Sequence, residues 1–112
     1  RVEKYMIDFD DRFAHRRLSM EQRRDFFLLF KEVINNIYKH SKATQVGIRI
    51  WFEKNDLHLQ VKDNGVGFDK SRSTERNGIK NMQARAERWN GRFLIHSEPG
   101  KGTETSISIP VV

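Results

Sequence analysis

The chain has 112 residues, no cysteine and a net charge of +6. That length corresponds to one domain, which can bury about 65% of its unfolded surface, and the lack of cysteine excludes disulfides, thiolate zinc sites and a cysteine nucleophile. The charge is divided evenly between residues 1–42 and 43–112, and acids such as Asp25 interleave with the densest arginine cluster, so the sequence predicts a solvated mixed-charge surface and no nucleic-acid partner.

The N-terminal part of the chain predicts an edge strand followed by a long helix. Apolar and polar residues alternate over residues 3–9, as they do in a half-buried strand. Ser19 stands where a helix N-cap would, and Gln22 lies three residues further on, as in a capping box. The helical pattern then continues to about His40.

The middle of the chain predicts a β-hairpin. Residues 46–52 and 57–62 each alternate between apolar and polar side chains, and the segment 54–56 between them has the composition of a turn.

An aperiodic polar segment, residues 64–78, follows the hairpin and predicts a mobile loop. We expect a second helix to begin directly after this loop, at residue 79, and to end at Gly91 as a glycine C-cap. Two closing strands are expected around residues 93–95 and 105–111.

Half-buried strands combined with amphipathic helices predict an α+β domain, a two-layer sandwich with helices on one face of a mixed, mostly antiparallel sheet. We expect residues 1–112 to form this single domain. Because the chain begins at Arg1 without an initiator methionine or a signal-like segment, we expect a fragment of a longer protein. No apolar run approaches the roughly 18 residues of a membrane span, so we expect no membrane contact by this fragment.

Four polar residues recur on one stripe of the first helix, because their spacings of four, seven and eight residues bring them to the same side. They are Glu32, Asn36, Lys39 and His40. An adjacent apolar stripe should face the sheet, and it consists of Phe26, Phe30, Val33 and Ile37. Oxygen and cationic groups beside the core would suit Mg²⁺ and phosphate oxygens, although the stripe alone is more typical of an ordinary helix border.

Asp63 ends the second hairpin strand on the same face as the apolar residues of that strand, so it points toward the core and needs a donor. An adenine amino group would satisfy it, since a hydrogen bond to a charged acceptor contributes about 1.5–3 kcal/mol. Gly65 and Gly67 would let the backbone approach a flat ligand closely. The alternative, which the motif alone favours, is an Asx-type turn leaving a strand.

Two further glycine segments are weaker signals. Residues 75–79 include Gly78 before the expected helix, whose free N–H groups and positive dipole end would attract phosphate. Residues 100–103, Gly-Lys-Gly-Thr, place the Thr103 hydroxyl at the start of the closing strand, but alone they predict an ordinary hairpin turn.

Together these segments resemble the motifs of GHKL ATPases, and most closely the catalytic ATP-binding domain of bacterial sensor histidine kinases. Residues 32–40, 63–68, 77–82 and 100–103 are similar to the N box, the G1 box, the G2 box and the closing Gly-Thr motif of that family. Residues 85–88, Arg-Ala-Glu-Arg, resemble the subgroup that pairs with LuxR-type response regulators. The resemblance extends from about residue 26 to Pro110.

The resemblance implies the Bergerat ATP-binding fold and a protein histidine kinase catalytic domain with ATP and Mg²⁺ as cofactors. Such a domain donates the γ-phosphate to a histidine on a separate helical phosphoacceptor domain of the same parent protein, and a response regulator is its indirect partner. The fragment alone should therefore transfer little. The resemblance also implies a cytoplasmic domain of a membrane-anchored bacterial sensor.

The family's roles carry over to matching positions at both ends of the nucleotide. At the base, Asp63 would accept from the adenine amino group, Thr103 would lie beside it, and two glycines would shape the pocket, namely Gly65 and Gly67.

At the phosphates, Asn36 would ligate Mg²⁺, and Glu32 would act catalytically by holding a metal-bound water or polarising the phosphate chain. Lys39 and His40 would face phosphate oxygens, and residues 68–78 would form a lid that closes over ATP. Two positions are implied where the lid meets the helix: Gly78, its hinge, and Ile79.

Two alternatives remain open. The same fold serves serine kinases that act on anti-sigma-factor antagonists and the ATPases of topoisomerases and mismatch repair, in which Glu32 would activate water. A degenerate, non-catalytic interaction module is the other, and its support is Arg76, which stands where the family usually has glycine, together with the basic charge.

Overall fold

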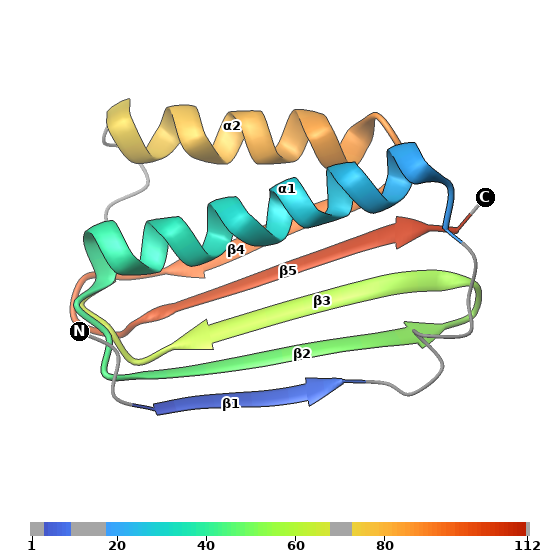
Figure 1. Cartoon of the computed structure of the whole chain (residues 1–112). Coiled ribbons are helices and arrows are strands. Elements are labelled where there is room, and N and C mark those ends of the chain that lie inside the picture. The colour runs from blue at the N-terminus through green and yellow to red at the C-terminus, as the bar shows by residue number, and fades with distance from the viewer. Residues whose placement is uncertain (1–3, 10–17, 68–72, 112) are drawn as a thin grey trace.

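A computed structural model of the chain, described for residues 4–9, 18–67 and 73–111, contains one five-stranded sheet with helices on one of its faces (Figure 1). The elements are, in chain order, β1 (Lys4–Phe9), α1 (Met20–Asn36), η2 (Ile37–Ser41), β2 (Gln45–Glu53), β3 (Asp56–Asp63), α2 (Ser73–Glu87), β4 (Arg92–Ser97) and β5 (Thr103–Pro110). The predicted two-layer sandwich is confirmed. Among the described elements, no helix is long and apolar enough to cross a bilayer.

The sheet has the strand order β1-β2-β3-β5-β4. β1 is a parallel edge strand and the other pairs are antiparallel, so the sheet is mixed and mostly antiparallel, as predicted. Lys54 and Asn55 have φ values of 51° and 67°, which is the geometry of a two-residue hairpin turn. Because β5 inserts between β3 and β4, Asp63 at the end of β3 lies opposite Thr103 at the start of β5.

α1 begins where the sequence predicts. The Ser19 hydroxyl accepts a hydrogen bond from the Gln22 backbone N–H at 3.0 Å, but the expected capping box is wrong, because the buried Gln22 side chain donates to the Pro110 carbonyl at 2.6 Å instead. This bond ties the start of α1 to the end of β5. The apolar stripe of α1 faces the sheet as expected and also includes Leu29, which is 1% exposed.

The long helix changes character at its end. α1 is regular only to Asn36, and residues 37–41 form a π-helical turn that closes at Lys42, in the left-handed conformation with φ 54°. A π turn is wider than an α turn, so the predicted single stripe does not continue unchanged beyond Asn36. Lys39 is exposed on this turn.

The second helix begins at Ser73, six residues earlier than predicted. Residues 73–78 contain no apolar side chain, so hydrophobic periodicity gives no sign of this first turn. Gly78 therefore lies inside α2, and the expected hinge at Gly78 is wrong. After α2 the left-handed residue is Asn90, with φ 59°, while Gly91 donates to the Ala86 carbonyl at 2.9 Å to close the helix.

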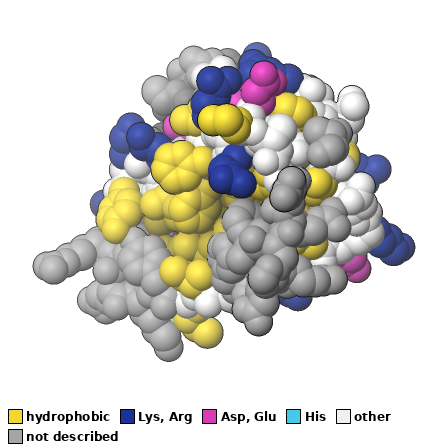
Figure 2. Space-filling view, turned by 45° about the vertical axis from the view of Figure 1, so that its right-hand side comes forward, with side chains coloured by type: hydrophobic (Ala, Val, Ile, Leu, Met, Phe, Trp, Pro, Cys, Tyr) yellow, Lys and Arg dark blue, Asp and Glu magenta, His cyan; other side chains and the backbone are white. Residues whose placement is uncertain are grey.

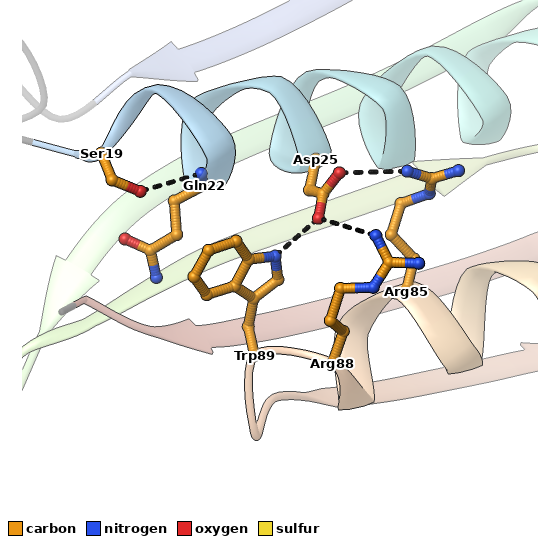
Figure 3. A network of polar contacts seen from close by, with 6 residues as sticks. All are labelled: Ser19, Gln22, Asp25, Arg85, Arg88 and Trp89. Atoms are coloured by element: carbon orange, nitrogen blue, oxygen red, sulfur yellow. Dashed lines mark hydrogen bonds and ion pairs between the residues drawn. The ribbon is translucent and has the colours of Figure 1, made fainter.

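One buried carboxylate joins the two helices (Figure 3). Asp25 of α1 is 2% exposed, which corrects the expectation that it belongs to a solvated charged surface. Its oxygens contact Arg85 Nη1 at 3.1 Å, Trp89 Nε1 at 2.7 Å and Arg88 Nη1 at 3.5 Å. Burial raises the pKa of this carboxyl, but the Trp89 hydrogen bond and the two arginine charges together bring the pKa below its ordinary value. We call this group the Asp25 clamp.

Candidate functional site

Asp63 is a desolvated acceptor at the end of the sheet. Its Oδ1 accepts from the Gly65 N–H at 2.8 Å, and the Thr103 N–H also donates to the carboxylate. Burial raises the pKa of Asp63 above its ordinary value, more than these two hydrogen bonds lower it. None of the ion pairs within the described part of the chain involves Asp63. The carboxylate is thus held in place by backbone donors and has capacity for one more donor.

The glycines beside Asp63 allow two loops of the chain to pack backbone to backbone. A Cβ on Gly67, which has φ 69°, would lie 2.0 Å from the Glu98 carbonyl oxygen, and one on Gly102 would lie 2.3 Å from that of Asp63. Gly100 donates to the Val66 carbonyl in the same contact. The close approach that Gly67 permits is therefore to the β4–β5 turn. These contacts fix the loop that carries Asp63.

Replacing Gly67 with alanine should lower the free energy of unfolding by about 2–4 kcal/mol, from left-handed backbone strain plus overpacking against the Glu98 carbonyl. Gly100→Ala is the matched control, since Gly100 also has positive φ, 82°, but no atom lies within 4 Å of its added Cβ. We expect the control to cost only about 1 kcal/mol. Urea unfolding of both variants measures the difference, and equal losses would show that the backbone contact contributes nothing.

A cavity of about 520 Å³ opens where β3 and β4 end and β5 begins, and its lining includes Asp63, Ser97 and Thr103. This volume lies in the range of small-molecule sites. Two lysines also line it, and each is paired with a glutamate: Lys62 with Glu104 at 3.8 Å, and Lys101 with Glu98 at 3.3 Å.

A second polar group lies between the helices. Gly78 of α2 faces Glu32 and Asn36 of α1, because a Cβ on Gly78 would lie 3.8 Å from Glu32 Oε1 and 4.0 Å from Asn36 Nδ2. The structure thus brings together three residues that the sequence predicts for the phosphate end. Figure 1 shows η2, the start of α2 and the ends of β3 and β4 at the same end of the molecule.

One carboxylate and one amide suit Mg²⁺, which usually takes one or two protein ligands and completes its shell with water and phosphate oxygens. The absence of a side chain on Gly78 leaves room beside them. The described residues contain no cluster of three or more His, Cys, Asp or Glu side chains able to hold a metal. The donor set therefore fits a metal that arrives with a phosphate ligand.

Several predicted positions contribute differently or lie outside the described residues. Ile79 is partly buried against the hydrophobic core. The side chains of His40 and Arg76 lie outside the part that the structure describes, as do residues 68–72 of the predicted lid.

Asn64 is a residue of this region that the sequence reasoning missed. Its Oδ1 accepts from the N–H groups of Thr44 and Gln45, both at 2.9 Å, and its Nδ2 donates to the Thr44 hydroxyl at 3.0 Å. Asn64 therefore ties the loop after Asp63 to the segment between η2 and β2. In the sequence it reads only as a turn residue.

Comparison with known proteins connects this geometry to a family. Residues 21–112 match the family of histidine kinase-, DNA gyrase B- and HSP90-like ATPases. The chain is 36% identical over 101 residues to the sensor histidine kinase YdfH of Bacillus subtilis, covering 87% of this chain and 25% of that protein. It is also 36% identical over 86 residues to the signal transduction histidine-protein kinase/phosphatase DegS of Brevibacillus brevis, covering 76% and 22%. The chain thus spans a quarter or less of these relatives.

The fold is likewise similar to that of a solved structure. The histidine kinase domain of the blue-light activated histidine kinase from Erythrobacter litoralis EL346 superposes with a TM-score of 0.80 at 21% identity, over 96% of this chain and 51% of that one. At this level of identity the likeness concerns the fold alone. It agrees with the sandwich predicted from the sequence, and the relatives confirm the resemblance to sensor histidine kinases.

Proposed function

Because the chain belongs to the family of histidine kinase-, DNA gyrase B- and HSP90-like ATPases, we propose that it binds Mg-ATP and presents the γ-phosphate to a histidine on a separate domain of its parent protein. The observation that carries the proposal is Asp63, a partly desolvated acceptor that lines a cavity at one end of the sheet. Glu32, Asn36 and Gly78 lie close to one another between the helices, and Figure 1 shows the start of α2 at that same end of the molecule.

The base binds at Asp63. The carboxylate accepts from the adenine amino group, Thr103 lines the same cavity, and the packed glycine loops hold both in position. A hydrogen bond from a neutral donor to this charged acceptor stabilises binding by about 1.5–3 kcal/mol.

The phosphates extend toward the two helices. Asn36 would supply an oxygen ligand to Mg²⁺, and Glu32 would hold a metal-bound water or polarise the phosphate chain; Mg²⁺, when bound, would supply positive charge against the phosphate oxygens. Lys39, His40 and the lid complete this end. Phosphoryl transfer needs mainly positioning and charge neutralisation, which these side chains supply.

The acceptor histidine belongs to a helical domain of the same parent protein, which we take to be a membrane-anchored sensor with a LuxR-type response regulator as the next acceptor. A protein partner is supported by exposed apolar side chains: Met20 and Phe27, seven residues apart on one side of α1, are 87% and 59% exposed. Figure 2 shows hydrophobic side chains gathered on one face beside lysine and arginine side chains.

The test has two parts. Calorimetric titration of the domain with ATP should show binding that weakens when Mg²⁺ is removed. The parent protein, incubated with ATP labelled in the γ-phosphate, should acquire an acid-labile label, whereas the isolated domain should acquire none. Absence of nucleotide binding would contradict the proposal and favour a non-catalytic interaction module.

A hydrolytic ATPase is the second candidate, because Glu32, which lies beside Gly78 between the helices, is a carboxylate that could act as a general base and activate water for attack on the γ-phosphate. Steady ATP hydrolysis by the domain alone, lost in Glu32→Gln with nucleotide affinity retained, would favour this candidate over phosphoryl transfer.

A further inference from the structure

Ser97, the last residue of β4, forms a short polar contact beside the proposed base site. It lies opposite Thr103 in the β4–β5 register, and its Oγ is 2.8 Å from Thr103 Oγ1 and 3.3 Å from the Gly102 carbonyl oxygen. Both hydroxyl residues line the cavity that contains Asp63.

The number of protons decides how these groups are oriented. The Ser97 hydroxyl has one proton, and the Gly102 carbonyl can only accept. For both contacts to be hydrogen bonds, Ser97 must donate to Gly102 and Thr103 must donate to Ser97. The Thr103 proton is then committed, so only the lone pairs of its oxygen remain available to a ligand.

The site therefore presents two acceptors side by side, since Asp63 lies opposite Thr103 across the β3–β5 pair and its ionised carboxylate has no proton. A base with an amino group at position 6 satisfies these acceptors. A 6-oxo base brings another acceptor to the same place and has on this edge a single donor, its N1–H, so it cannot satisfy both acceptors and leaves at least one polar group unpaired, which a partly desolvated site penalises.

We infer that Ser97 is a specificity-determining residue, which holds the Thr103 hydroxyl as an acceptor and thereby makes the site select a 6-amino purine over a 6-oxo purine. The inference rests on the proposed nucleotide site and adds a positioning residue to it. Ser97 acts through Thr103 and need not contact the base.

The test compares ATP with inosine triphosphate, which has the same sugar and phosphates but a 6-oxo base, by calorimetric titration in the presence of Mg²⁺. The wild-type chain should prefer ATP. In Ser97→Ala the Thr103 proton becomes free to donate, so the ratio of the two dissociation constants should fall about tenfold. Ser97→Thr, which retains the hydroxyl, should restore the ratio.

Two further variants separate orientation from simple stability. Ser106→Ala, a change on the neighbouring strand β5, is the matched control and should leave the ratio unchanged. In a Thr103→Val background, Ser97→Ala should alter the ratio no further, because the hydroxyl that it orients is gone.

An equal loss of affinity for both nucleotides in Ser97→Ala, with an unchanged ratio, would overturn the inference while leaving the ATP site in place. Failure of the wild-type chain to bind either nucleotide would overturn the proposed function itself, and the inference with it.

Discussion

Asp63→Asn should weaken Mg-ATP binding by about 5- to 30-fold, because a neutral acceptor replaces a charged one and the hydrogen bond from the adenine amino group becomes weaker by about 1–2 kcal/mol. The fold should not suffer. Burial raises the pKa of the Asp63 carboxyl, so its charge already opposes folding, and an amide can still accept from the Gly65 N–H. We therefore expect the unliganded variant to unfold at the same temperature as the wild type or at a higher one.

The raised pKa also fixes the sign of two pH effects. The unfolded chain loses the Asp63 proton near the ordinary pKa of an aspartate, about 3.9, whereas the folded chain retains it up to a higher pH. As the pH rises from the unfolded pKa through the folded pKa, Asp63 therefore lowers the free energy of unfolding progressively. ATP binding should change in the opposite direction and weaken as the pH falls through the folded pKa. Asn has no carboxyl group to titrate, so Asp63→Asn should lose the part of each pH dependence, of stability and of ATP binding, that comes from residue 63.

Calorimetric titration and scanning calorimetry of the two proteins measure these effects. Asp56→Asn is the matched control, since Asp56 begins the same strand at the end away from the cavity. Equal ATP affinity in wild type and Asp63→Asn would remove the adenine assignment, and a large loss of stability would show that the charge supports the fold.

The position of Asp63 could be predicted because it depends on local geometry. Every second residue of a strand points to the same face of the sheet. Asp63 follows the buried apolar residues of β3 at this spacing, so the sequence predicts that it lies on the core-facing side. The same alternation predicts the hairpin, and the helical period of 3.6 residues predicts the sheet-facing stripe of α1.

The start of α2 and the end of α1 could not be predicted in the same way. The first turn of α2 has no apolar side chain to mark it, and the π turn of η2 interrupts the regular spacing on which the stripe was projected. As a result, Gly78 lies inside a helix rather than at a hinge, although it still faces Glu32 and Asn36.

Hydrogen bonds between residues far apart in the sequence also could not be predicted from local sequence patterns. Asn64 bonds to residues about 20 positions earlier, and the partners of Asp25 lie 60 or more positions later. Where acidic and basic residues alternate, the neighbours of a buried acid in the sequence do not differ from those of an exposed acid. The sequence therefore predicts Asp25 on the surface. Only the packing of α2 on α1 distinguishes it.

Asp25→Ala should lower the free energy of unfolding by about 2–4 kcal/mol, because it leaves the Trp89 indole N–H and the Arg85 guanidinium without their buried acceptor. The loss should lie toward the low end of the range for broken buried pairs, since both arginines keep access to water. For a domain of this size, the loss corresponds to a fall in melting temperature of roughly 10 °C or more.

Arg88→Ala is the graded control. Arg88 is 62% exposed and contacts Asp25 at 3.5 Å, so its removal should cost less than about 1 kcal/mol. Urea unfolding of the two variants measures the contrast. If Asp25→Ala lost no more stability than Arg88→Ala, the clamp would be an incidental surface contact.

The Asp25 clamp should also respond to acid in the direction opposite to Asp63. The pKa of Asp25 is lowered in the folded state, so its contribution is fully present above the unfolded value of about 3.9 and is lost as the pH falls through the folded pKa. Asp25→Asn removes this charge with little change in volume, so the wild type should be the more stable protein at neutral pH and should lose that advantage below pH 4. Asp63→Asn should show the opposite sign, because there the wild type is the less stable protein at neutral pH and recovers as the pH falls through the raised folded pKa. The clamp fixes α2 against α1, and Gly78 of α2 faces Glu32 and Asn36 of α1. Asp25→Asn should therefore also weaken the Mg²⁺ dependence of nucleotide binding at neutral pH. Calorimetric titration with nucleotide, with and without the metal, would measure this change.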